Sequence, residues 1–203
     1  GLFVCGPQVD EQLKEKITAL SEKLQVPILA DPLSQLRAGS HHKTTIISGY
    51  DAMFRSKTIR EILKPDYIIR FGAMPLSKSF LFYVEEHEDM REPTNHASEY
   101  IFTDGSLLCE DLLAYVERET NGDWLSKWRQ MNDVINEELT VASDVKLTEG
   151  EAVREMMEVL PDRSRLFVAN SMPVRDLDTF FLPTDKHIFV HANRGVSGID
   201  GTV

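Results

Sequence analysis

The sequence predicts an α/β fold: a Rossmann-like, doubly wound, six-stranded parallel sheet with helices on both faces. Short apolar runs rich in strand-forming residues recur along the 203 residues, and stretches with helical spacing of apolar residues separate them. Such alternation favours parallel strands joined by right-handed crossovers, which place helices on both faces of the sheet. Six ranges are expected as strands: Leu2–Cys5, Val26–Ala30, Tyr67–Phe71, Tyr100–Thr103, Leu166–Ala169 and Ile188–His191.

Helical spacing of apolar residues fills several of the intervals between these strands. Asp10 is a plausible N-cap for a helix whose apolar face runs from Leu13 to Leu24. A second helix is expected over about 58–63. Phe80–Val84 is too short to assign from periodicity, and we expect a helix there because a crossover must join the third and fourth strands.

Further along the chain the helix signals are stronger. A start signal at 121–123 precedes four apolar residues that share one helical face: Trp124, Trp128, Met131 and Ile135. Thr148 and Glu151 have capping-box spacing ahead of an apolar stripe from Val153 to Leu160. The simplest interpretation of both stripes is core packing, because helical spacing alone does not indicate a cofactor site.

Composition restricts the kind of protein. A net charge of −11 argues against a nucleic acid or an anionic membrane as a general partner. No apolar run approaches the ~18 residues of a membrane-spanning helix. Cys5 and Cys109 have neither Cys-x-x-Cys nor zinc-site spacing, which favours a reducing compartment. With no signal or transit peptide visible, we expect a cytoplasmic protein.

Both ends of the sequence predict a segment of a longer protein. The chain begins directly in an expected strand and ends in the glycine-rich stretch 198–203. Domains usually begin and end in exposed polar linkers instead. A processed native chain is the alternative, but it explains neither end.

Polar residues follow the fifth expected strand. Pro173 suits the first turn of a helix, so Ser171 lies at or just before a helix N-terminus, and Arg175 lies one turn further on the same side. Backbone N–H groups at a helix N-terminus favour an anion, and a guanidinium can bind both oxygens of a carboxylate. The alternative is a serine N-cap with an arginine on a solvated face, and the local pattern alone favours it.

Two further cations follow other strands. Arg194 begins a glycine-rich loop after the sixth strand, on the same sheet edge as Arg175, and two arginines there would bind an anion better than one. The loop could equally be a flexible linker. Lys78 follows the third strand, but a sheet ordered 3-2-1-4-5-6 would place it far from the fifth, and a surface lysine is the alternative.

Several familiar sites are absent. Gly6-Pro7-Gln8-Val9 after the first strand is not G-x-G-x-x-G, so a nicotinamide dinucleotide fingerprint is missing there, and no G-x-S-x-G or Ser-His-Asp arrangement is visible. His41 and His42 could pair on a metal, but no carboxylate or cysteine accompanies them at ligand spacing, so a solvated loop is favoured. We expect neither a catalytic residue nor a metal ligand in this segment.

Four segments carry a resemblance to a known family. They are RFGAMPLSKSFLFY, EYIFTDG, FVANSMPVRDLD and VHANRGVSGIDGTV. Together they resemble the middle domain of the MenD family, the thiamine-diphosphate-dependent synthases of menaquinone biosynthesis. The resemblance covers essentially the whole chain, and its NRGxSGIDG run is the most specific part. It implies that residues 1–192 form a central domain and that residues 193–203 begin a linker into the cofactor-binding domain.

The resemblance implies an activity that this segment would share with other domains. The whole enzyme would decarboxylate 2-oxoglutarate on thiamine diphosphate and add the succinyl carbanion to isochorismate, giving 2-succinyl-5-enolpyruvyl-6-hydroxy-3-cyclohexene-1-carboxylate. It would be a homodimer or tetramer whose active sites lie between the first and last domains, which also hold thiamine diphosphate and Mg2+. The isolated segment is therefore expected to be inactive.

The resemblance also implies roles for particular residues. Ser171 and Arg175 match residues that hold a substrate carboxylate, and Arg194 matches an arginine on the substrate side. Ile199 matches the bulky residue that supports the bent conformation of the cofactor. Lys78 matches a substrate-contacting lysine, although a serine follows it where the family often has arginine.

Two other classes of function stay open. The chain could be a stand-alone α/β module that binds a ligand or a regulator, with Arg37, Arg55 and Arg70 as candidate binding residues. Solvated surface positions are the simpler interpretation of these three arginines. It could also be a structural spacer that orients two catalytic domains.

Overall fold

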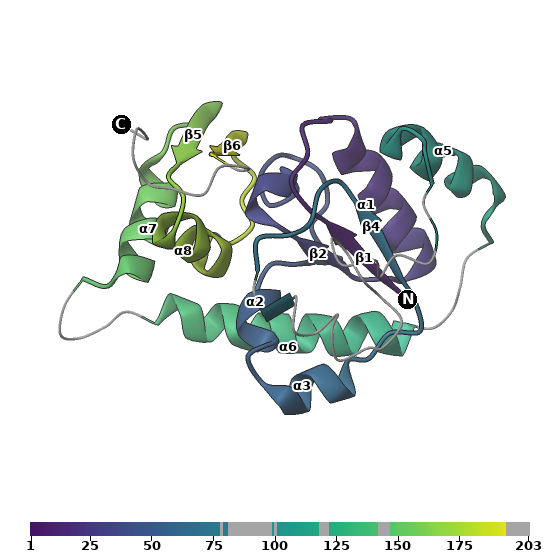
Figure 1. The fold of residues 1–203 in the computed structure, drawn as a ribbon, viewed down its shortest axis with the longest axis horizontal. Coiled ribbons are helices and arrows are strands. Elements are labelled where there is room, and N and C mark those ends of the chain that lie inside the picture. The colour runs from purple at the N-terminus through teal and green to yellow at the C-terminus, as the bar shows by residue number, and fades with distance from the viewer. Residues whose placement is uncertain (78, 81–98, 100, 118–121, 142–146, 194–203) are drawn as a thin grey trace.

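In the part of the chain that the structure describes, the strands form two separate parallel sheets (Figure 1). The computed structural model describes residues 1–77, 79–80, 99, 101–117, 122–141 and 147–193. The strands are β1 (Leu2–Cys5), β2 (Ile28–Ala30), β3 (Ile46–Ile47), β4 (Ile68–Phe71), β5 (Ser164–Val168) and β6 (Ile188–Ala192). The larger sheet has the order β3-β2-β1-β4, and β5 pairs with β6 in the smaller one. The prediction of an α/β fold with parallel strands is confirmed, whereas that of one six-stranded sheet is wrong.

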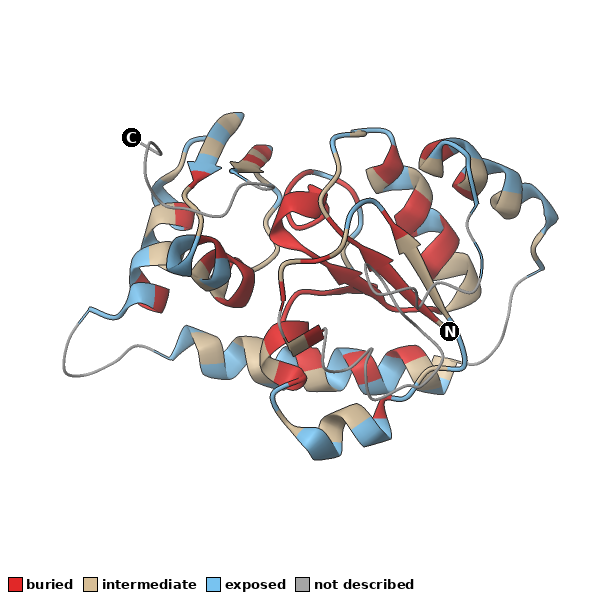
Figure 2. Cartoon of the chain, in the orientation of Figure 1, coloured by how far each residue is buried: buried red, intermediate tan, exposed pale blue. Residues whose placement is uncertain are grey.

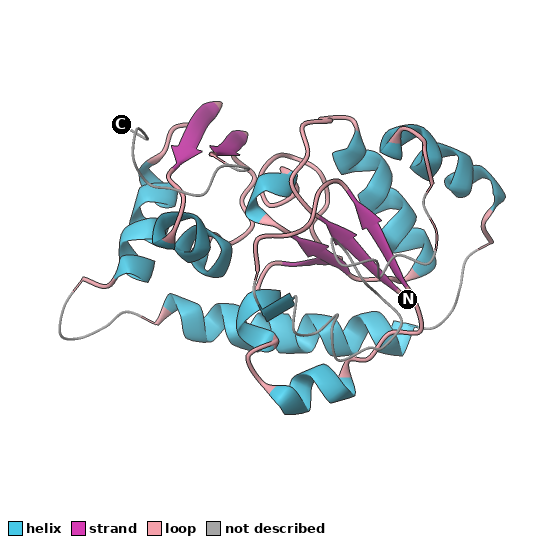
Figure 3. Cartoon of the chain, viewed as in Figure 1, coloured by secondary structure: helices cyan, strands magenta, loops and turns pink. Residues whose placement is uncertain are grey.

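The helices lie around these sheets (Figure 3). They are α1 (Leu13–Leu24), the short 3₁₀ helix η1 (Pro32–Ser34), α2 (Tyr50–Met53), α3 (Lys57–Ile62), α5 (Gly105–Tyr115), α6 (Gly122–Thr140), α7 (Glu149–Val159) and α8 (Met172–Phe180). The predicted capping box of α7 is confirmed, since Glu151 N–H donates to Thr148 Oγ1 at 3.2 Å and Thr148 N–H donates to Glu151 Oε2 at 2.7 Å. In contrast, α1 begins at Leu13, and Asp10 accepts a bond from the backbone of Gln12 instead of capping the helix.

One strand was predicted where the structure has none, and one strand was missed. Residues 101–103 form a loop in which the side chain of Phe102 is 95% exposed, so this part of the expected strand at Tyr100–Thr103 does not enter a sheet. Asp104, directly after it, accepts a bond from Leu107 N–H and so starts α5, a helix that the sequence analysis did not predict. Conversely, β3 has two residues, too few for an alternating pattern. Of the expected helix at 80–84, Phe80 is helical and the rest lies outside the described residues.

Strand β1 distributes its side chains to the two faces of the larger sheet, as the two-residue period of a strand requires. Leu2 and Val4 pack with residues of α2 and α6, and Phe3 and Cys5 pack with residues of α1 and α5. Helices therefore cover both faces of this sheet. Its strands β1, β2 and β3 are buried throughout, whereas β4 is only partly buried (Figure 2).

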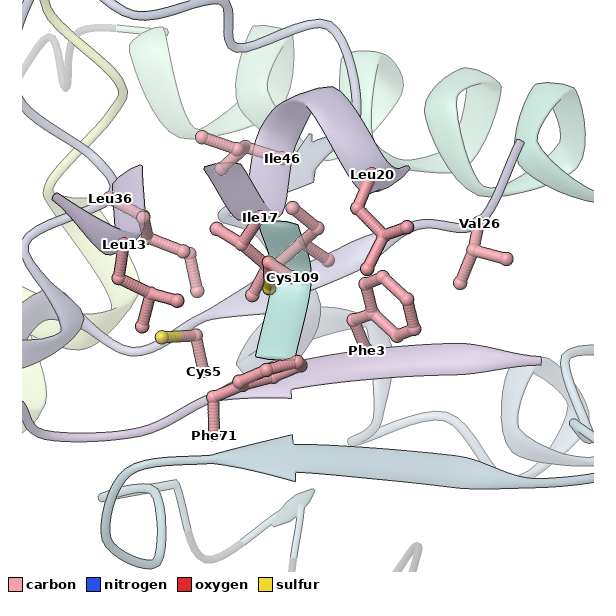
Figure 4. Packing of buried hydrophobic residues seen from close by; sticks show 12 residues of the cluster. Phe3, Cys5, Leu13, Ile17, Leu20, Val26, Leu36, Ile46, Phe71 and Cys109 are labelled. Atoms are coloured by element: carbon pink, nitrogen blue, oxygen red, sulfur yellow. The ribbon is translucent and has the colours of Figure 1, made fainter. Parts of the chain in front are cut away.

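Both cysteines belong to the layer between the sheet and α1 (Figure 4). Cys5 and Cys109 are free thiols without exposed surface. Burial raises the pKa of Cys109 to about 12 and raises the pKa of Cys5 as well. Both side chains therefore stay protonated and act as small apolar core residues.

One connection joins the two sheets. We define the bridging segment as residues 31–39, which follow β2. Gly39 N–H donates to the carbonyl of Thr184 at 3.1 Å, and Thr184 N–H donates to the carbonyl of Arg37 at 2.8 Å. The side-chain amide of Gln35 donates to the Val190 carbonyl at 2.8 Å and accepts from Val190 N–H at 3.0 Å. This segment therefore satisfies backbone groups of β6 that a neighbouring strand would otherwise satisfy.

The smaller sheet has its own apolar cluster. Leu33 and Ala38 of the bridging segment pack there with side chains of α7, α8 and both strands. No helix in the described part of the chain is long and apolar enough to cross a membrane.

Trp128 lies at the centre of the layer below the larger sheet. Its side chain is fully buried, and its ring meets those of Phe54 at 5.9 Å and Trp124 at 5.8 Å in edge-to-face geometry. Within the described residues its indole N–H has no hydrogen-bond partner.

We expect Trp128→Ala to lower the free energy of unfolding by about 3–5 kcal/mol, because it leaves a cavity in the core. Trp128→Phe should cost much less, since it keeps a ring and removes an unpaired donor. Val134→Ala, a change at a 58% exposed position of α6, serves as the control and should stay within about 0.5 kcal/mol. Chemical denaturation measures all three. A loss below 1 kcal/mol for Trp128→Ala would contradict this packing.

Candidate carboxylate-binding site

Ser171 occupies the N-cap position of α8 in a strained conformation. Its φ of 74° and ψ of −129° lie in a region that favours glycine, and such a backbone costs on the order of 1–3 kcal/mol. The hydroxyl makes no capping hydrogen bond, and the residue is exposed. The interpretation of Ser171 as an ordinary serine cap is therefore wrong, because its side chain does not satisfy the helix N-terminus.

Arg175 lies one turn into α8 and is exposed. Pro173 occupies the first turn, as predicted. Within the described residues the Arg175 guanidinium forms no ion pair, and its Nη1 lies 4.0 Å from Met172 Sδ. A hydroxyl, a guanidinium and the backbone N–H groups of the first helical turn thus occur together at one end of α8, which is a donor set suited to a carboxylate.

The other predicted site residues lie outside the described residues: Lys78, Arg194 and Ile199. The structure nevertheless gives the register of the strands that precede two of the loops. Val168 at the end of β5 pairs with Ala192 at the end of β6, so the chain leaves both strands at neighbouring points. This register is consistent with a shared site for the residues that follow them, and the roles of all five residues stay predictions.

The loop before Lys78 is tied to α8 through Asp51. Ser77 Oγ donates to Asp51 Oδ1 at 2.6 Å, and Thr179 of α8 donates to Asp51 Oδ2 at 3.4 Å. Arg55 pairs with the same carboxylate at 2.7 Å. The loop after β4 is thus fixed to the helix that carries Ser171 and Arg175, a connection that a simple strand order does not predict.

The reversal point of the larger sheet, between β1 and β4, is filled by backbone. Ala73 N–H donates to the Pro7 carbonyl at 3.0 Å, and a Cβ on Gly6 would lie 1.7 Å from the Ala73 carbonyl oxygen. Gly72 adopts a positive φ of 74° in the same contact. Ligands of open α/β sheets often bind at such a point, but here two loops pack directly against each other.

Sequence reasoning missed a buried ion pair at the C-terminal end of α8. Arg37 has no exposed surface, and its Nη2 lies 2.7 Å from Asp178 Oδ1. Tyr50 donates its hydroxyl to the same carboxylate at 3.2 Å. The expectation that Arg37 lies on a solvated surface is wrong. Its sequence neighbours carry no local signal, because its partner is 141 positions away.

Arg55, Arg70 and His41 make contacts within the chain. Arg55 is partly exposed in its pair with Asp51, and Arg70 Nη1 lies 3.6 Å from Met74 Sδ. His41 is buried with Nε2 at 2.8 Å from the Leu36 carbonyl, so the expectation of a solvated loop is wrong at this position. Among the described residues, no group of three acidic, histidine or cysteine side chains could hold a metal ion.

Burial raises the pKa of the Asp178 carboxyl above its ordinary value, and the charges of Asp31 and Asp51 act in the same direction. The charge of Arg37 at 2.7 Å lowers the same pKa and favours the carboxylate. The folded chain therefore keeps the proton of Asp178 to a higher pH than the unfolded chain does.

We expect this difference in proton binding to make the free energy of unfolding fall as the pH rises above about 4, through the range in which the folded chain still holds the proton. Asp178→Asn removes the titrating group, so the pH dependence of that variant should be flatter than that of the parent chain. Urea denaturation at pH 5, 6, 7 and 8 measures both slopes. Equal slopes in the two proteins would contradict the raised pKa.

The comparison with known families identifies the class. Residues 1–168 match the family model described as "Middle domain of thiamine pyrophosphate", and the chain belongs to this family. The match ends before Ser171, so it assigns nothing to that residue or to Arg175.

Similar proteins carry the name of one particular enzyme. A protein named 2-succinyl-5-enolpyruvyl-6-hydroxy-3-cyclohexene-1-carboxylate synthase from Oceanobacillus iheyensis is 47% identical over the whole of this chain. Proteins of the same name from Geobacillus thermodenitrificans and Bacillus pumilus are 41% and 37% identical, also over the whole chain. The chain spans 37% of the length of each of these relatives.

Proposed function

We propose that this chain is the middle part of a 2-succinyl-5-enolpyruvyl-6-hydroxy-3-cyclohexene-1-carboxylate synthase and contributes a carboxylate-binding edge to its active site. Similarity over the whole chain to proteins of that name supports the assignment. The observation that carries the local role is the exposed hydroxyl and guanidinium at the N-terminus of α8, supplied by Ser171 and Arg175.

The proposed substrates suit this donor set. The whole enzyme would decarboxylate 2-oxoglutarate and join the remaining four-carbon unit to isochorismate, and both molecules carry carboxylates. Arg175 would bind one carboxylate through two parallel hydrogen bonds, with Ser171 and a backbone N–H group completing the contact. Because arginine stays protonated at any working pH, the site holds its charge throughout the reaction. The contribution of this chain is therefore orientation of the substrate.

The cofactor site belongs to the remainder of the protein in this proposal. Thiamine diphosphate supplies the chemistry of carbanion formation when it is bound. Among the described residues no group of three acidic, histidine or cysteine side chains could hold Mg2+. Residues 1–192 would form the central domain, and 193–203 would lead toward the cofactor-binding domain, with Lys78, Arg194 and Ile199 completing the site. The full-length protein would assemble as a homodimer or tetramer.

In the full-length protein, we expect Arg175→Ala to raise the KM for 2-oxoglutarate about tenfold or to lower kcat by a similar factor, because a charge-assisted contact is lost. The free energy of unfolding should change by no more than about 1 kcal/mol, as at other exposed positions. Arg129→Ala, at an exposed position of α6, is the matched control and should leave both parameters unchanged. Steady-state kinetics and chemical denaturation of the same samples measure the two effects. If Arg175→Ala unfolds the protein, the role of Arg175 is structural.

Two substitutions of Ser171 separate the backbone strain at this residue from the contact of its hydroxyl with substrate. Glycine adopts a φ of 74° without steric cost, so Ser171→Gly should exceed Ser171→Ala in free energy of unfolding by about 1 kcal/mol or more. Both variants lack the hydroxyl, so both should raise the KM for 2-oxoglutarate to the same degree. Kinetic parameters of Ser171→Gly that equal those of the parent enzyme would rule out a hydroxyl contact with substrate.

A further inference from the structure

Arg37 uses its guanidinium to hold one end of a helix. Its Nη1 donates to the backbone carbonyls of Asp178 at 2.7 Å and Phe181 at 2.9 Å, and its Nη2 donates to the Asp178 carboxylate at 2.7 Å. Its Nε donates to the carbonyl of Ala30, the last residue of β2, at 2.7 Å. A cation at the C-terminus of a helix satisfies free carbonyls and interacts favourably with the helix dipole.

The helix that Arg37 holds is α8, which carries the candidate site at its other end. Nine residues of helix span only about 13 Å, and a segment this short moves as one unit. Val174 and Leu177 bury its apolar face in the cluster of the smaller sheet. Because the two ends are rigidly connected, a displacement at the C-terminal end shifts Ser171 and Arg175 as well.

Stability alone does not account for an ion pair in this place. Burying a guanidinium and a carboxylate costs desolvation energy that their attraction often only offsets, and apolar residues of similar size are frequently as stable. The pair fixes the position of α8 instead. Four hydrogen bonds from one planar guanidinium hold this helix relative to the end of β2. Apolar packing without these bonds would let the helix slide along its axis.

We propose that Arg37 is a positioning residue for the carboxylate site: by holding the C-terminal end of α8, it fixes where Ser171 and Arg175 meet the substrate. This role rests on the proposed function of those two residues. Arg37 does not touch the substrate, and it acts through the helix.

The test uses the full-length protein and Arg37→Lys, which keeps the charge but cannot make the same four bonds. We expect the KM for 2-oxoglutarate to rise about tenfold, since small displacements of a binding group cost this much or more. In an Arg175→Ala background, Arg37→Lys should raise the KM by a clearly smaller factor than it does in the parent protein, because one of the two residues through which it acts is already gone. Asp178→Asn, which has nearly the shape of the parent side chain, should behave in the same way and replaces Arg37→Lys if that variant does not fold.

Ser21→Ala controls for loss of stability as such, because Ser21 is buried and donates to the Val26 carbonyl far from α8. It should lower the melting temperature and leave the KM unchanged. An unchanged KM in Arg37→Lys and Asp178→Asn would overturn the proposal, as would an equally large effect of Arg37→Lys with and without Arg175. If Arg175→Ala alone leaves the kinetics unchanged, the carboxylate site itself is wrong, and the proposal falls with it.

Discussion

The arrangement of the two sheets depends on the buried pair of Arg37 and Asp178. Arg37 belongs to the bridging segment after β2, and Asp178 belongs to α8, so their contact joins elements of the larger and the smaller sheet. Gln35 adds a second link, because its side-chain amide pairs with the backbone of Val190 as a strand would. A single short segment thereby replaces the strand pairing that a continuous six-stranded sheet would have provided.

Two acidic residues near this pair, Asp31 and Asp51, also join segments that are remote in sequence. Asp31 accepts from the backbone N–H groups of Leu33 and Leu76, and Asp51 accepts from Ser77 and Thr179. Each carboxylate thus connects two segments that are remote in sequence. Buried carboxylates of this kind are costly unless every oxygen is satisfied. Once they are satisfied, they favour one arrangement of the loops over others that apolar packing would tolerate.

Clear local signals predicted their elements correctly. The capping box of Thr148 and Glu151 identified the start of α7, and the apolar run at Leu2–Cys5 identified a strand. Two other features were not predicted, one because a neighbouring cap overrides composition and one because its partner is distant in sequence. YIFT has the composition of a strand, but Asp104 starts a helix immediately after it and Phe102 stays exposed. The position of Arg37 could not be inferred, since nothing near it in sequence indicates a partner on α8.

At the candidate site, too, one feature was predicted from local sequence and another was not. A proline in the first turn and an arginine one turn later placed Ser171 and Arg175 at the start of a helix, as the structure has them. The positive φ of Ser171 carried no sequence signal, because serine is not a residue that such a backbone favours. A conformation of this cost persists only where surrounding structure holds it. In this chain α8 is held at its C-terminal end by Arg37 and along its buried face by Val174 and Leu177, so the helix that begins at the strained residue is itself fixed in place.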